Sequence, residues 1–192
     1  MPTELVPNEP LLTDRLSLEP WSAAASELLG RLASQPEVMH FVGTGTPWTE
    51  EHTAEVAARC LEHWHQHGFG WRVAVERETG AGLGFIALGF AGEGAGIAAD
   101  EYEIGWWLEP PAWGRGLARE GAQAICREAF DRLAAPSVVA RISPDNAASL
   151  GVAGAIGMIP EGESQGRFGE PIAVLRLSNS DWRTRSDQGL PG

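Results

Sequence analysis

The stretch from Tyr102 to Phe130 decides the fold, and it reads YEIGWWLEPPAWGRGLAREGAQAICREAF. It begins with an apolar run typical of a strand and ends with the apolar spacing of an amphipathic helix. Between them, Gly114 and Gly116 form a turn in which backbone N–H groups can approach a ligand without interference from a Cβ atom. The following helix directs the positive end of its dipole and its unpaired N–H groups at the same place. The stretch therefore predicts a phosphate or pyrophosphate site.

Two common phosphate motifs do not fit this turn. A dinucleotide-binding fingerprint has the pattern G-x-G-x-x-G, but Arg119 stands where the third glycine belongs. A P-loop needs a lysine, and all 14 basic residues of the chain are arginine. The glycines within residues 91–99 precede no predicted helix, so that segment is interpreted as a plain linker or as a flexible loop beside the substrate cleft.

The turn resembles a motif of a known family. Residues 113–118, Trp-Gly-Arg-Gly-Leu-Ala, are similar to motif A of the GNAT (Gcn5-related) N-acetyltransferases, Gln/Arg-x-x-Gly-x-Gly/Ala. Trp113 replaces the usual Gln or Arg, and with Glu120 this resembles the RimJ/RimL-like branch, which acetylates the N-termini of ribosomal proteins. Four further segments are similar to that branch and occur in the same order: Thr13–Leu18, Pro36–Phe41, Pro144–Ser149 and Ile156–Met158.

The resemblance implies an α+β fold with a GNAT-type mixed central sheet, helices on both of its faces, and two splayed parallel strands at the acetyl-CoA cleft. The sequence pattern is compatible with this fold, because a strand-helix-strand unit gives parallel neighbours and a hairpin gives antiparallel ones. The expected strands are 15–19, 71–77, 82–90, 102–108, 137–142 and 172–177. The expected helices are 23–33, 49–67, 116–133 and 146–156, with a short helical segment at 36–41. Thr49 is expected to cap the second helix, and Gly68 and Gly70 are expected to end it.

Composition sets further bounds on the protein. A chain of 192 residues fits one domain, placed at 1–183, and residues 184–192 lack periodicity and are expected to be a flexible tail. The net charge of −12 argues against a nucleic-acid partner and favours a cationic one. No apolar run is long enough for a membrane span, so we expect a cytoplasmic protein, monomeric or homodimeric. Cys60 and Cys126 occupy apolar helix positions, which predicts buried, inert thiols.

The family resemblance also implies the residues that bind acetyl-CoA. Its pantetheine arm would pair with the strand edge formed by Trp106, Trp107 and Leu108. Its pyrophosphate would lie on the N–H groups of the turn, at Gly114, Arg115, Gly116, Leu117 and Ala118. Arg119 would add charge-assisted contacts to phosphate, or would be a solvated helix residue. Asn146 would cap the next helix and contact the cofactor arm. The rings of the two tryptophans alternate in direction, so at least one is expected to pack in the core.

Acetyl transfer to an amine needs a neutral nucleophile, a stabilised oxyanion and a proton for the departing thiolate. A backbone N–H near Leu108 is the candidate for the oxyanion. Glu103, which precedes Ile-Gly as in the family, is the candidate base, with a salt bridge as the alternative. Many GNAT enzymes place a tyrosine acid at the position of Ala153, so Ser149 is the substitute candidate here. A hydrogen bond at the helix N-terminus is the alternative role of Ser149.

The expected substrate is a primary amine, either a protein N-terminal α-amine or a small cationic amine. The pKa of an α-amino group is about 8 and that of a lysine amine is about 10.4, so a site without a conspicuous base suits an α-amine better. A non-catalytic acyl-CoA-binding module is the alternative function. The acceptor pocket is expected from residues 50–67, 91–99 and the C-terminal strands. No metal is predicted, because Cys60, His63 and His67 lie on one short helical face and cannot surround a tetrahedral ion.

Overall fold

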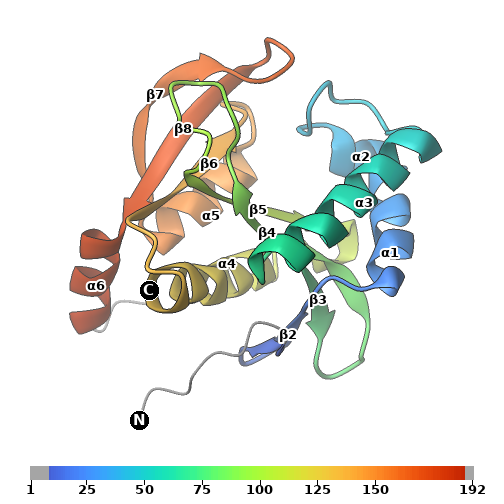
Figure 1. The fold of residues 1–192 in the computed structure, drawn as a ribbon, viewed down its shortest axis with the longest axis horizontal. Helices are drawn as coiled ribbons and strands as arrows, with labels where there is room; N and C mark the ends of the chain where they lie inside the picture. The colour runs from blue at the N-terminus through green and yellow to red at the C-terminus, as the bar shows by residue number, and fades with distance from the viewer. Residues whose placement is uncertain (1–8, 189–192) are drawn as a thin grey trace.

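The computed structural model describes residues 9–188, which form a mixed sheet covered by helices (Figure 1). The strands are β1 Leu11–Leu12, β2 Leu16–Glu19, β3 Arg72–Glu76, β4 Gly82–Phe90, β5 Tyr102–Leu108, β6 Ser137–Ile142, β7 Ile159–Gln165 and β8 Pro171–Ser178. The helices are α1 Ala23–Ala33, α2 Pro36–Met39, α3 Glu50–His67, α4 Leu117–Arg127, α5 Ala147–Ile156 and α6 Asn179–Asp187. A 3-10 turn η1, Pro110–Ala112, precedes α4, and a π-helical turn η2, Glu128–Arg132, continues it.

The sheet divides between two parallel strands. Its eight strands follow the order β1-β2-β3-β4-β5-β6-β8-β7, and the neighbours are antiparallel except for β5 and β6. Among the described residues the β5–β6 ladder has two register pairs, Tyr102 with Val138 and Glu103 with Val139. Both strands continue beyond this point without pairing to each other. The predicted mixed sheet with splayed parallel strands is therefore confirmed, and we call the divergence of β5 and β6 the fork.

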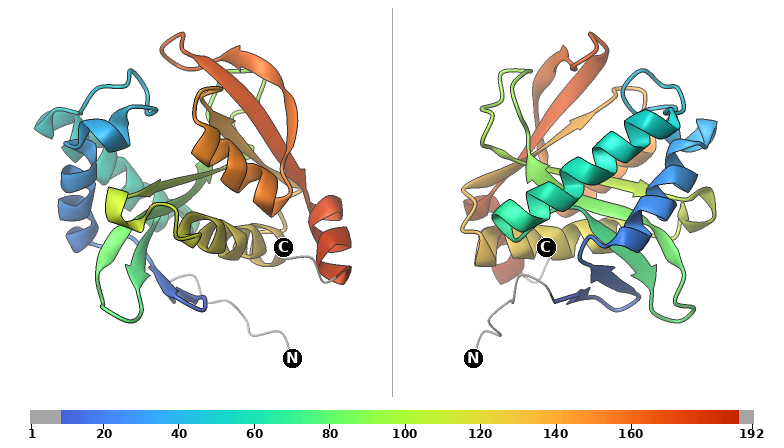
Figure 2. Two further views of the ribbon diagram at one scale, coloured as in Figure 1. Left: turned by 180° about the vertical axis from the view of Figure 1, so that it is seen from behind. Right: turned by 45° about the vertical axis from the view of Figure 1, so that its right-hand side comes forward.

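Two apolar clusters pack on the two faces of the sheet. One contains the buried faces of α4 and α5, and the other contains those of α1 and α3 (Figure 2). The alternation of β5 sends the Trp106 ring toward the first cluster and the Trp107 ring toward the second. Helix α4 lies close to β4, because a Cβ atom on Gly121 would come within 2.6 Å of the Ile86 side chain. None of the described helices combines the length and apolar character that crossing a membrane requires.

Local capping explains where several helices begin and end. Thr49 accepts a hydrogen bond from the His52 N–H at the start of α3, and Gly68 ends that helix in the left-handed region at φ +67°. Asn146 caps α5 in the same way through its side-chain oxygen, which accepts from the backbone N–H of Ser149 at 3.0 Å. Both caps agree with the positions predicted from the sequence.

The structure differs from the sequence prediction at the C-terminus. Residues 184–187 were expected in a flexible tail, but they belong to α6, and 189–192 lie outside the described residues. The helix forms because Ser178 caps it through the Asp181 N–H, and because Trp182 is buried against Phe130 with 5.7 Å between ring centroids. Strand β7 was not predicted either, since its side chains are largely exposed and show no apolar alternation.

A buried ion pair joins β3 to the turn η2. Arg72 and Glu128 are both 0% exposed, and two guanidinium nitrogens of Arg72 donate to the two carboxylate oxygens at 3.1 and 2.6 Å. Arg72 also donates to the Leu18 carbonyl, and Arg132 donates to Glu128 at 2.7 Å. The Trp64 ring lies 5.0 Å from the Arg72 guanidinium carbon. The pair therefore connects three elements in the interior: the β3–β4 hairpin, the η2 turn at the end of α4, and helix α3.

Removing one partner of this pair is expected to destabilise the protein strongly. Glu128→Ala should lower the free energy of unfolding by about 3–5 kcal/mol, because it leaves the Arg72 charge buried without its carboxylate. Arg183→Ala is the matched control, since its ion pair with Asp131 is exposed and should contribute less than about 1 kcal/mol. Urea denaturation of both variants measures the difference. Equal losses would contradict a special role for the buried pair.

Candidate active site

A cavity of about 540 Å³ lies in the fork of the sheet. Its floor is the diverging ends of β5 and β6, and its walls come from the glycine turn, the first turns of α4 and α5, and the α2 segment. Several candidates from the sequence line it: Trp106, Trp107, Leu108, Gly114, Gly116, Leu117, Ala118, Arg119, Asn146 and Ser149. Residues from three separate parts of the chain, 37–42, 104–119 and 140–152, thus meet in one space.

The glycine turn has the backbone geometry that its sequence predicted. Gly114 and Gly116 adopt φ values of +69° and +77°, and Gly116 is the N-cap residue of α4. The N-terminal N–H groups of α4 therefore point toward the cavity end that this turn lines. Trp113 explains the departure from the family motif, because its indole N–H donates to the Leu108 carbonyl at 2.7 Å. This bond fastens the turn to the end of β5.

A strap formed by residues 13–15 holds the first turn of α4. The Thr13 hydroxyl and the Arg15 guanidinium donate to Glu120 at 2.6 and 2.7 Å, and Arg15 also donates to the Arg115 carbonyl at 2.8 Å. Burial raises the pKa of Glu120, but these hydrogen bonds outweigh it and leave the pKa below its usual value. The strap therefore contributes to stability above the ordinary carboxyl pKa, and the contribution is lost as the pH falls below it.

Two arginines at the turn point in different directions. The Arg115 side chain forms an ion pair with Glu76 and does not line the cavity. Arg115 therefore contributes only its backbone to the turn. The hydrogen bond from Arg115 holds the pKa of Glu76 below its usual value. Arg119 lines the cavity and has no ion-pair partner among the described residues. Its guanidinium is thus available to an anion bound at the N-terminus of α4.

Ser149 lies at the opposite wall and faces β5. The indole N–H of Trp106 donates to the Ser149 hydroxyl oxygen at 3.1 Å. Because an indole nitrogen can only donate, Ser149 must accept, and its own hydroxyl proton is free for another acceptor. The cap of α5 uses the backbone N–H of Ser149, bonded to Asn146, and does not involve the hydroxyl. The Ser149 hydroxyl therefore does not cap α5, which was the alternative role for it.

Glu103 lies at the fork, but it does not line the cavity. Arg141 of β6 donates to both of its carboxylate oxygens, and this hydrogen bonding raises the pKa of Arg141. Arg141 does line the cavity, and it also donates to the Ala91 carbonyl at 2.7 Å. The salt bridge that the sequence left open for Glu103 is therefore present. Each carboxylate oxygen of Glu103 keeps a lone pair that Arg141 does not use.

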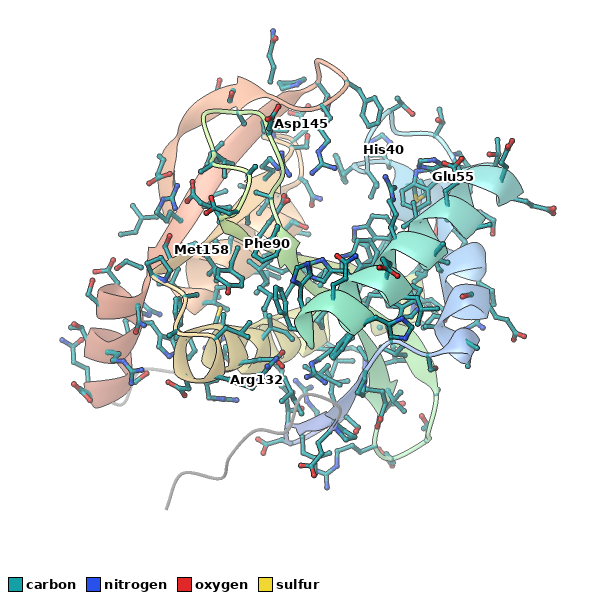
Figure 3. The ribbon with its side chains drawn as sticks, viewed as in Figure 1. His40, Glu55, Phe90, Arg132, Asp145 and Met158 are labelled. Carbon is teal, nitrogen blue, oxygen red and sulfur yellow. The ribbon has the colours of Figure 1, made fainter. Side chains whose placement is uncertain are left out.

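The wall opposite α5 was not predicted. Glu37, Val38, Phe41 and Val42, in α2 and the residues after it, line the cavity. No residue of 50–67, of 91–99 or of the C-terminal strands β7 and β8 lines it, which corrects the expected acceptor pocket. Figure 3 shows His40 and Asp145 on the two sides of this opening, one after α2 and the other before α5. The resemblance of residues 36–41 to a family segment was the one signal for this wall in the sequence.

The histidines of α3 form part of an aromatic cluster. The rings of His63 and His67 are 4.6 Å apart and both contact Phe69 and Phe90. Burial, followed by the charge of His67, lowers the pKa of His63. In the described part of the chain, no three His, Cys, Asp or Glu side chains gather in a way that would hold a metal ion. Burial raises the pKa of both cysteine thiols to about 12, so they stay protonated and unreactive.

Comparisons with known proteins show which family the chain belongs to. Residues 15–159 match the model of the acetyltransferase (GNAT) domain, which is more than half of the chain. The chain therefore belongs to the GNAT acetyltransferase family. It is 31% identical over 150 residues to the FsC-acetyl coenzyme A-N(2)-transacetylase of Aspergillus fumigatus, covering 77% of this chain but 64% of that protein. It is 26% identical to the N-acetyltransferase p20 of Bacillus licheniformis, covering 80% of this chain and 84% of that one.

Solved structures show the same fold. The acetyltransferase from Agrobacterium tumefaciens superposes with a TM-score of 0.73 at 31% identity, over 88% of this chain and 93% of that one. The ribosomal-protein-S5-alanine acetyltransferase from Vibrio fischeri gives a TM-score of 0.70 at 16% identity, over 90% and 98%. At that identity the second likeness concerns the fold alone.

Gly116→Val is expected to abolish binding of coenzyme A while the protein stays folded. A β-branched side chain resists the φ of +77°, and a Cβ atom there would lie 3.5 Å from the Arg15 guanidinium that holds the turn, so the N–H groups would lose the arrangement that an anion needs. Gly80→Val is the matched control, since Gly80 has φ +72°, is exposed in the β3–β4 turn and has open space around a built Cβ. Calorimetry with coenzyme A and thermal melts compare the two. Unchanged affinity in a folded Gly116→Val protein would refute the anion site.

Proposed function

We propose that this protein is an acetyl-CoA-dependent N-acetyltransferase of the RimJ/RimL-like type, acting on a primary amine by direct attack in a ternary complex. The observation that supports it most is the meeting of the fork, the left-handed glycine turn and Ser149 in one cavity. The names of its relatives, an N(2)-transacetylase among them, favour a nitrogen acceptor. That the chain is a single domain, and that the protein is cytoplasmic, stay predictions from the sequence; the boundary at 183 is not kept, because α6 continues to Asp187.

The cavity suits acetyl-CoA in shape and in chemistry. Beyond Glu103 the β6-side edge of β5 has no ladder partner among the described residues, so an extended arm can pair with Trp106, Trp107 and Leu108. The turn from Gly114 to Ala118 offers N–H groups to the pyrophosphate, and Arg119 adds a positive charge. The thioester supplies the activated acetyl group. Asn146 contacts the arm in this proposal, and its place in the lining of the same cavity supports that role.

Ser149 is the candidate that protonates the departing thiolate. Its hydroxyl lies on the cavity wall, and the Trp106 indole occupies one acceptor position of the oxygen. The hydroxyl proton is thereby directed elsewhere, and the donated hydrogen bond stabilises the oxygen once that proton has left. This arrangement fills the role that Tyr plays in many GNAT enzymes, since Ala153 replaces that tyrosine and is fully buried.

Ser149→Ala is expected to lower kcat by about 10²-fold, the low end for a general acid, and to leave coenzyme A affinity nearly intact. The α5 cap survives this change, because it uses the Ser149 backbone. Assays of free thiol release measure kcat, calorimetry measures the affinity for coenzyme A, and thermal melts measure stability. Full turnover in the variant would point to water as the acid, and loss of coenzyme A binding would make the hydroxyl a cofactor contact.

Glu103 stays the candidate base, now with Arg141 as its partner. If the carboxylate accepts the amine proton, Glu103→Gln should lower activity most below neutral pH and recover part of it as the pH rises, because the amine then loses its proton unaided. The pH dependence of kcat/KM measures this. A loss of equal size at every pH would assign Glu103 to the positioning of Arg141, and wild-type rates throughout would remove it from the mechanism.

A non-catalytic acyl-CoA-binding module is the second candidate function. The replacement of the family tyrosine by Ala153 favours it, whereas the hydroxyl of Ser149 on the cavity wall favours catalysis. Turnover of acetyl-CoA with a panel of N-terminal peptides, polyamines and aminoglycosides distinguishes the two. Thiol release with any of these amines above the amine-free rate supports the enzyme, and tight binding without release supports the module.

A further inference from the structure

We infer that the acceptor carries a second cationic group, and that Glu37 on α2 binds it, as in a small unbranched diamine; this rests on the proposed acetyl transfer. The reacting nitrogen then lies beside β5 and Ser149, and the second cation lies at the opposite wall. Glu37 is thus a specificity-determining residue.

The charged side chains on the cavity wall differ in whether they have a partner. Among residues 9–188, three charged side chains line the cavity: Glu37, Arg119 and Arg141. Arg141 is neutralised by the two oxygens of Glu103, and Arg119 lies at the turn that would hold phosphates. Glu37 is exposed and has no ion-pair or hydrogen-bond partner recorded within residues 9–188. Among the three, Glu37 is therefore the carboxylate that no cation of residues 9–188 neutralises.

The place of Glu37 is set by its neighbours. Helix α2 begins with Pro36, and Val38 and Met39 are buried, so the backbone that carries Glu37 is anchored while its carboxylate faces solvent. Beside it the cavity wall is apolar, formed by Phe41, which is 41% exposed, and by Val42. An aliphatic chain between two cations would cover this apolar surface and end at the carboxylate.

The second cation, and not the reacting amine, is the partner of Glu37. A carboxylate beside an ammonium favours the charged form, and a charged amine cannot attack a thioester. Glu37 and Ser149 come from opposite walls, α2 and α5, and the fork lies between them. A diamine can place one nitrogen at the fork while the other stays protonated at Glu37.

The segment after α2 meets the β7–β8 hairpin. A Cβ atom on Gly43 would lie 3.2 Å from the ring of Phe168, and Arg167 of the same hairpin donates to the Ala91 carbonyl at 2.6 Å, where Arg141 also donates. Apart from Arg141, these residues do not line the cavity themselves, but their contacts support the segment that carries Phe41 and Val42.

The test compares 1,4-diaminobutane with butylamine, which differ in the second cation. The wild-type kcat/KM should be higher for the diamine, and Glu37→Gln should reduce that preference by roughly tenfold, mainly through the KM of the diamine. Glu51→Gln is the matched control, because it makes the same carboxylate-to-amide change at an exposed residue in the first turn of α3 that does not line the cavity. This variant should keep the preference for the diamine. Glu37→Lys should turn the preference toward 4-aminobutyrate, which a purely structural role of Glu37 would not cause.

The outcomes separate this inference from the proposed function. A wild-type protein that binds coenzyme A but acetylates no amine, peptides included, would overturn the proposed function itself. Equal acetylation of the diamine and butylamine, or a Glu37→Gln variant with unchanged preference, would overturn the role of Glu37 and leave the acetyltransferase intact. Preference for an N-terminal peptide without a second cation would also overturn it. Thermal melts of each variant confirm that folded proteins are compared.

Discussion

The ion pair between Glu103 of β5 and Arg141 of β6 stands where the sheet divides, and the rest of the site depends on that division. The two strands pair for two residues and then separate, so their inner edges are left without strand partners. A closed sheet would bury these edges and leave no cavity. The pair bridges the strands just at the fork, and Arg141 extends the connection to the Ala91 carbonyl. The ion pair thus connects β5 and β6 where the backbone hydrogen bonds between them end.

The two faces of the sheet contribute different parts of the cavity. The α4 and α5 face supplies the turn, Arg119 and Ser149, whereas the α1 and α3 face positions α2 and therefore Glu37. Trp106 and Trp107 are neighbours in β5 and pack into opposite clusters, so this strand connects the two halves. The buried Arg72–Glu128 pair makes a second connection, between the hairpin and the end of α4. A relative shift of the two faces would alter the distance between the two cavity walls.

Features that depend on local backbone chemistry could be predicted from the sequence, and features that depend on distant packing could not. Caps such as Thr49 and Gly68 use atoms a few residues away, so their positions followed from residue type. The glycine turn belongs to the same class. In contrast, the direction of the Arg115 side chain depends on Glu76, 39 residues away, and the burial of Glu128 depends on Arg72. Glu37 reaches the cavity through the packing of α2, which no local pattern in the chain expresses.

The strap of residues 13–15 makes the amino-terminal strand part of the ligand-binding equilibrium. Its bonds to Glu120 and to the Arg115 carbonyl hold the same turn that an anion would contact. A ligand that orders this turn must therefore also favour the docked strand, and docking of the strand must raise the affinity for the ligand by the same factor. Ligand binding in the cavity is therefore expected to slow hydrogen exchange in β2 and in the strap that precedes it.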